Sequence, residues 1–176
     1  MAYSNIIDPS AHFQTAIYTG NGDSSDDTNA ITNDGNSDLQ PDFIWLKRRD
    51  YDNGYQLIDS SRGVDKFLGS ETTAAETTLS GRLASFDTDV FTVQSSSGAF
   101  NAENEPFVAW QWKANGGTTS TNNDGDVTST VQVNQDAGFS IITDGPHANT
   151  NARTIGHGLG KKPTFIIRFN RTRIEN

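Results

Sequence analysis

The apolar residues of this chain gather in short runs, and the run at residues 39–50 has the most informative pattern. It contains a proline, alternates Phe43 and Trp45 with Ile44 and Leu46, and ends in charged residues. Because successive side chains of a strand point to opposite faces, the extended run has apolar residues on both faces. The pattern predicts a central strand that is covered on both sides.

Similar short runs recur along the chain, separated by Gly, Asn, Asp and Ser. They predict strands at residues 13–19, 55–59, 64–70, 106–113, 127–133 and 139–143, and a turn that leads into a strand at 86–93. Residues 71–79 are the one stretch whose composition is compatible with a helical turn, and it is too short to be stable alone. Short strands at a spacing of roughly 10 residues are typical of sandwiches and barrels. The sequence therefore predicts an all-β fold, an antiparallel β-sandwich of the jelly-roll or lectin-like kind.

Part of this pattern occurs twice. Residues 13–20 resemble 139–145, Ile31 resembles Ile155, and 39–47 resemble 159–168, where Pro163 precedes a second apolar run. A repeat of about 120 residues is a whole domain, because solenoid units have roughly 20–50 residues. We therefore expect the sandwich to be followed by the start of a second, similar module.

A change of composition to Gly, Thr and Ser after residue 115 predicts a domain boundary. The expected organisation is an N-terminal arm (1–14), a β-sandwich module (15–115), a flexible linker (116–136) and the beginning of a second, incomplete β module (137–176).

Composition narrows the possible environments. The chain has no cysteine, which excludes a disulfide framework and thiolate metal sites. The first residues lack the basic and apolar regions of a signal peptide, and no apolar run approaches the roughly 18 residues of a membrane span. We expect no membrane insertion and no export by a cleavable signal.

The net charge of −9 is distributed unevenly. Residues 1–150 hold 21 acidic and 7 basic side chains, whereas residues 151–176 hold 6 basic side chains and only Glu175 as an acid. An acidic body argues against nucleic-acid binding, which needs a basic face. The basic tail is interpreted as a solvated edge or as a contact to the acidic body of a neighbouring copy.

Two loops are rich in Asp and Asn, at residues 23–38 and 122–126. Calcium takes six to eight oxygen ligands, but neither spacing matches an EF-hand loop. Both are interpreted as solvated loops, the first with Ile31 in the core, and no metal site is assigned.

Catalytic patterns are weak. His12, His147 and His157 lie far apart, and there is no Gly-X-Ser-X-Gly motif. Asp87 and Asp89 are two residues apart and would share one face of a strand. Glycosidases need two carboxylates close together, but these two sit in a turn motif. The sequence therefore indicates a protein that is not an enzyme, with no catalytic residue, cofactor-binding residue or cofactor assigned.

Three tryptophans could stack on sugar rings. The strands of Trp45 and Trp110 are apolar on both faces, which favours burial of these two, and Trp112 is expected to be partly exposed.

Five motifs resemble one known family. They are Tyr18-Thr19-Gly20-Asn21-Gly22, Gln40-Pro41-Asp42-Phe43-Ile44-Trp45-Leu46-Lys47, Asp59-Ser60-Ser61-Arg62-Gly63, Ser85-Phe86-Asp87-Thr88-Asp89-Val90-Phe91 and Val108-Ala109-Trp110-Gln111-Trp112-Lys113-Ala114-Asn115-Gly116-Gly117. In this order they are similar to an uncharacterised repeat domain of structural proteins in tailed phages, especially marine ones. Residues 156–160 resemble the matching segment of that family's next module. The resemblance implies location in the virion, on a tail fibre or other appendage, and a lectin-like sandwich.

The sequence thus favours a non-enzymatic virion structural protein, a module of a phage tail fibre or comparable appendage that supports host attachment. Its expected partners are copies of itself, with a trimer as one form, and neighbouring virion proteins. A lectin-like module that binds host surface glycan, through loops such as 23–38, is the alternative. An enzyme that depolymerises surface polysaccharide with Asp87 and Asp89 is a third hypothesis.

Overall fold

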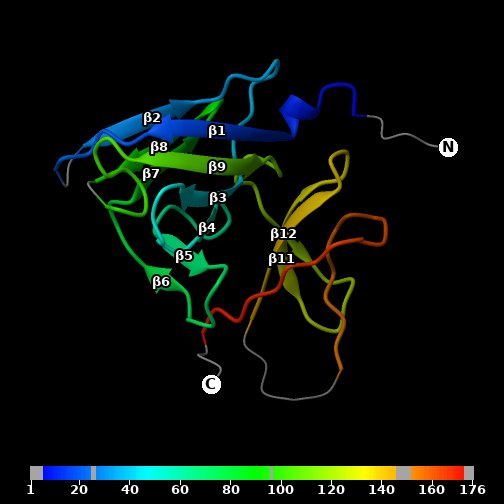
Figure 1. The fold of residues 1–176 in the computed structure, drawn as a ribbon. Coiled ribbons are helices and arrows are strands. Elements are labelled where there is room, and N and C mark those ends of the chain that lie inside the picture. The colour runs from blue at the N-terminus through cyan, green and yellow to red at the C-terminus, as the bar shows by residue number, and fades with distance from the viewer. Residues whose placement is uncertain (1–5, 25–26, 96, 146–151, 173–176) are drawn as a thin grey trace.

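The fold is an all-β sandwich of antiparallel sheets, seen in a computed structural model that describes residues 6–24, 27–95, 97–145 and 152–172 (Figure 1). A short 3-10 helix, η1 (Pro9–Ala11), precedes the first strand. Asp8 caps this helix, because its carboxylate accepts a hydrogen bond from the Ser10 N–H at 2.9 Å. Within the described residues no helix is long and apolar enough to cross a membrane.

One layer of the sandwich is a six-stranded sheet in the order β1-β9-β3-β4-β5-β6. Its strands are β1 (Phe13–Thr19), β3 (Phe43–Arg48), β4 (Gln56–Asp59), β5 (Lys66–Gly69), β6 (Thr77–Thr78) and β9 (Pro106–Trp112). The opposite layer is a three-stranded sheet in the order β2-β8-β7, formed by β2 (Thr28–Thr32), β7 (Leu83–Asp87) and β8 (Val90–Gln94).

The core lies between these two layers. The six-stranded sheet contributes residues such as Ile44, Leu46 and Phe107, and the opposite sheet contributes Phe91 and Val93, all at most 1% exposed. Alternation of side chains along each strand places these residues on one face and leaves their neighbours on the other face of the sheet.

A third sheet stands beside the sandwich (Figure 1). It has the order β10-β11-β12, with β10 (Ser120–Asn122), β11 (Ser129–Asn134) and β12 (Phe139–Asp144). Two of these strands lie within residues 116–136, so the prediction of a flexible linker there is wrong. Polar and β-branched residues such as Thr130 and Val131 form an amphipathic strand once β12 pairs with it.

The central strand is confirmed, but only one of its faces is in the core. β3 lies between β4 and β9 and pairs with both. Ile44 and Leu46 point into the core, whereas Phe43 and Trp45 lie half-buried on the outer face of the sheet. The expected strand at 13–19 is also confirmed, with the same bounds.

Two other local predictions are wrong. Residues 71–79 do not form a helical turn, and β6 lies there instead, paired with β5. The loop at 23–38 contains β2, although Ile31 is buried in the core as expected. Both strands are rich in threonine, and their extended conformation depends on pairing with neighbours rather than on an apolar pattern.

The second apolar run does not form a strand. Residues 163–168, called the tail segment from here on, are irregular, and Phe165 and Ile166 are 77% and 73% exposed. Ile155 makes only an isolated bridge with Val127. Of the three repeated landmarks in the second half, only 139–144 is a strand, because the tail segment has no described strand beside it to complete its backbone hydrogen bonds.

Candidate functional site

The outer face of the six-stranded sheet carries a cluster of aromatic side chains, called the aromatic face. Strand pairing aligns Phe13, Trp112 and Phe43 in one row across β1, β9 and β3. The next row aligns Trp110 with Trp45. Residues opposite one another in antiparallel strands share a face, so the register itself gathers these rings.

Phe139 of β12 covers one end of the aromatic face. Its ring centroid lies 6.2 Å from that of Trp112, at an interplanar angle of 22°, and 6.1 Å from that of Phe43. Phe13 packs on the other side of Trp112, at 4.8 Å. The third sheet therefore docks on the sandwich through an aromatic contact.

The other end of the aromatic face is open. Trp45 packs edge-on against Trp110 at 6.3 Å and against Tyr55 at 6.0 Å, and all three are half-buried. Lys47 lies over the Tyr55 ring, with 5.2 Å between Nζ and the ring centroid. The expectation that Trp45 and Trp110 are buried in the sandwich is wrong, because both side chains lie on the outer face of the sheet and are half-buried there. Partial exposure of Trp112 is confirmed.

Asp42 is fully buried and holds a turn in place. Its carboxylate accepts hydrogen bonds from the N–H groups of Ala114 at 2.7 Å, Gly116 at 2.9 Å and Gly117 at 2.8 Å, and from the Ser60 hydroxyl at 2.7 Å. Gly116 and Gly117 have φ of 59° and 78°, a conformation that glycine adopts without strain. The carboxylate that follows Pro41 is therefore used to fix the backbone.

Gln132 of β11 joins the third sheet to the same place. Its Oε1 accepts hydrogen bonds from the N–H groups of Asn115 at 3.1 Å and Gly117 at 2.8 Å. Its Nε2 donates to the hydroxyls of Ser60 at 3.0 Å and Ser61 at 2.8 Å. Asp42, Ser60, Gly117 and Gln132 together are called the polar junction.

The polar junction unites three of the motifs that carry the family resemblance, those around Asp42, Ser60 and Gly117. They lie far apart in sequence, yet their polar atoms are hydrogen-bonded around the buried side chains of Asp42 and Gln132. Buried polar groups need such partners, and a fully satisfied network specifies one arrangement of the chain. These motif residues thus build the connection between sheets.

A charged cluster anchors the C-terminal end. Arg62 pairs with Asp59 at 2.5 Å and with Glu76 at 3.1 Å. Arg171 pairs with Glu76 at 2.8 Å, and the Glu76 N–H donates to the Arg171 carbonyl at 2.9 Å. Burial on its own would raise the pKa of Glu76, but hydrogen bonds from Arg171 and Arg62 outweigh it and lower the pKa.

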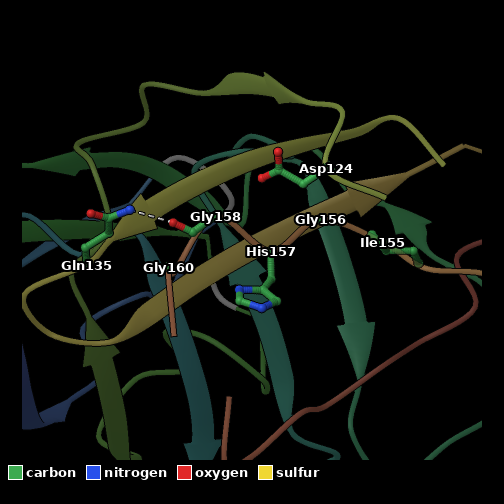
Figure 2. A pocket seen from close by; sticks show the side chains of 7 residues that line it. All are labelled: Asp124, Gln135, Ile155, Gly156, His157, Gly158 and Gly160. Carbon is green, nitrogen blue, oxygen red and sulfur yellow. Dashed lines mark hydrogen bonds between the residues drawn. The ribbon is translucent and has the colours of Figure 1, made fainter. Parts of the chain in front are cut away.

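A hollow of about 420 Å³ lies over the third sheet (Figure 2). Seven residues line it: Asp124, Gln135, Ile155, Gly156, His157, Gly158 and Gly160. Figure 2 shows the His157 ring pointing away from Asp124. His157 Nδ1 accepts the Leu159 N–H at 3.1 Å, and Gln135 donates to the Gly158 carbonyl at 2.8 Å. The His157 imidazole therefore belongs to a turn, and its ring is not directed at the carboxylate of Asp124.

The structure does not bring the other titratable candidates together. His12 Nδ1 lies 3.2 Å from Asn134 Nδ2, and His147 lies outside the described residues. Asp87 accepts from Ser85 at 2.5 Å, whereas Asp89 has φ of 62° at the β7–β8 turn and accepts the Leu39 N–H at 3.4 Å.

The acidic loops are hydrogen-bonded within themselves and to nearby turns. Asp27 accepts the N–H groups of Asp23 and Ser24 at 2.9 Å each, and these hydrogen bonds, that of Ser24 first, lower its pKa. Asp126 accepts from the Thr154 hydroxyl at 2.9 Å. Among the residues that the structure describes, no group of three or more His, Asp or Glu side chains is placed to hold a metal ion.

Comparison with known proteins gives one match. The family model described as a domain of unknown function (DUF7483) matches residues 8–176. Neither the curated proteins nor the solved structures contain a match to the chain.

Proposed function

We propose that this chain, which belongs to the DUF7483 family, is a non-enzymatic structural module of a virion appendage such as a phage tail fibre. There it assembles with copies of itself and with neighbouring virion proteins, and it supports attachment to the host. The proposal is supported by where the polar and apolar side chains of the chain lie.

The observation that carries this proposal is a contrast between buried polar groups and exposed apolar ones. The polar groups of the polar junction form hydrogen bonds that join the sheets. In contrast, the apolar residues Ile17, Phe165 and Ile166 are 67%, 77% and 73% exposed. Catalysis needs free polar groups that converge on a reacting atom, whereas assembly needs apolar surface that a partner can bury. The distribution therefore favours assembly.

Labelling of particles tests this function. Antibodies against the purified chain are expected to label an appendage of intact virions in immuno-electron microscopy, and the purified chain is expected to form oligomers. A monomeric chain together with unlabelled virions would remove the proposal.

The open end of the aromatic face supports a second candidate, binding of host surface glycan. Half-buried aromatic rings on a sheet can stack on the apolar faces of pyranose rings, and Trp110 and Tyr55 have this exposure. Carbohydrate stacking needs no metal, so the acidic loops are not required for it.

A glycan array measures this candidate directly. We expect binding that Trp110→Ala reduces at least tenfold, while Tyr51→Ala, which changes an exposed aromatic residue outside the face, leaves it unchanged. If no glycan on the array binds the chain, with or without calcium, glycan binding is excluded and the structural proposal is unaffected.

A further inference from the structure

Within the part of the chain that the structure describes, two stretches lack a neighbouring strand on one side or both, and they are complementary. One is the tail segment, an apolar run with the β3 pattern. The other is the free edge of β1. We propose that the tail segment of one copy adds as a strand to the β1 edge of a second copy, which deepens the proposed assembly function and rests on it.

The backbone of the tail segment is available for pairing. Among the described residues, no backbone hydrogen bond reaches residues 163–168. The segment is held at both ends, because Gln135 donates to the Gly158 carbonyl on one side and Arg171 pairs with Glu76 on the other. It is thus an exposed, apolar stretch that lies between two anchored positions, Gly158 and Arg171.

The free edge of β1 offers matching groups. Gly20 donates to the Glu105 carbonyl and Lys113 donates to the His12 carbonyl, both at 2.9 Å. In an antiparallel ladder alternate residues face the same neighbour, so the groups of even-numbered residues point to β9. The N–H and C=O groups of Thr15 and Ile17 therefore point away from the sheet.

Nothing in the β1 sequence protects this edge. Proteins usually guard exposed edge strands with Lys, Pro, bulges or covering segments. The seven residues Phe13–Thr19 contain no charge and no proline, and Ile17 is 67% exposed on the outer face. Asn29 Nδ2 donates to the Thr19 carbonyl at 3.0 Å, so the stretch that another strand can extend is the one around Thr15 and Ile17.

Charge favours a second copy as the occupant. Basic side chains flank the tail segment, with Lys161 and Lys162 before it and Arg171 after it. Acidic side chains flank β1, with Asp8 before it and Asp23 after it. Arg171 is already paired with Glu76, so the exposed Lys161 and Lys162 supply the positive charge that the acids beside β1 attract, and like surfaces repel each other.

Pairing within one copy is disfavoured by distance. The sheet order places β6 at the opposite edge from β1, and Arg171 is anchored to Glu76, which directly precedes β6. Five strand spacings correspond to roughly 24 Å. Figure 1 shows the red end of the chain on the β6 side, with β1 on the far side of the sheet. Addition between copies is therefore head-to-tail, a geometry that closes into a ring or extends as a filament.

Proline substitution on β1 tests the proposal in the full chain. Thr15→Pro removes an N–H that faces away from β9, so the sheet keeps its own ladder, which edge strands permit. Ile166→Lys changes the other surface. In sedimentation equilibrium we expect each to weaken self-association at least tenfold. The control Leu79→Lys, at an exposed apolar residue outside both surfaces, should associate as the unchanged chain does.

The outcomes separate this inference from the assembly function. If the unchanged chain associates and both variants associate equally well, strand addition is wrong and assembly stands. If the unchanged chain is a monomer while antibodies label virions, the inference is wrong and the structural role stands. Near-UV circular dichroism shows whether Thr15→Pro is folded, and Ile17→Lys takes its place if it is not.

Cross-linking provides a second, independent measurement. Because the chain has no cysteine, a Thr15→Cys copy mixed with an Ile166→Cys copy can form only introduced disulfides. Residues directly opposite one another in paired strands lie within disulfide reach, and this cysteine pair tests the register that places position 166 opposite position 15. A heterodimer that forms with Ile166→Cys and not with Leu79→Cys supports the proposal, and equal yields contradict it.

Discussion

β3 and the tail segment share one sequence pattern and have different structures. Each follows a proline and contains Phe-Ile and further apolar residues before a basic residue. β3 is paired on both sides and its Leu46 lies in the core at 0% exposure. The tail segment pairs with no strand among the described residues, and Ile166 is 73% exposed. Both runs have an apolar pattern that is compatible with a strand. Only the run that pairs with neighbouring strands, β3, is extended in a sheet.

Truncation of one large apolar side chain in β3 and of one in the tail segment compares how well the two runs are packed. Leu46→Ala should lower the free energy of unfolding by about 2–5 kcal/mol, because it leaves a cavity in the core. Ile166→Ala should change it by less than about 0.5 kcal/mol in dilute solution, because the side chain is exposed. Urea denaturation measures both, and equal losses would show that the tail segment is packed.

A second comparison concerns the residue after each proline. Asp42→Asn places an amide N–H₂ among buried N–H donors, so we expect a loss of about 1–3 kcal/mol in the free energy of unfolding. Thr164, which follows Pro163, is exposed, and Thr164→Asn should have no measurable effect. A stable Asp42→Asn protein would contradict the role assigned to the polar junction.

The smallest expected effect is a pH response of the tail anchor. The pKa of Glu76 is lowered in the folded chain from its ordinary value of 4.5, so the stability that its ion pairs contribute is complete above that pH. This contribution is lost as the pH falls through the folded pKa. The Arg171 side-chain N–H signal in NMR should report release of the anchor below that pH. In Arg171→Gln the tail should already be released at pH 7, and an unchanged pH response of the tail in that variant would contradict the anchor.

Particular residues show how much the sequence could predict. The alternation in β1 and β3 was sufficient to place both strands, because their core faces are strongly apolar. β2, β6 and β10 were missed because threonine, serine and asparagine also form turns, and only pairing with a neighbour makes them extended.

The candidate site was less predictable. The motifs around Asp42, Ser60 and Gly117 could be recognised, but their shared role could not, since it depends on hydrogen bonds to Gln132 and between residues far apart in sequence. The open end of the aromatic face was missed because the pattern of Trp45 and Trp110 is the same for a covered and an uncovered outer face. Which face is covered is set by where the third sheet docks.

Amide hydrogen exchange at two protein concentrations compares β3 and the tail segment most directly. The amides of β3 should be protected at both concentrations. The amides of the tail segment should exchange fast in dilute protein and become protected in concentrated protein, together with Thr15 and Ile17. Protection of the tail segment in dilute monomer, or its absence at every concentration at which the chain associates, would contradict a strand that is completed only by a second copy.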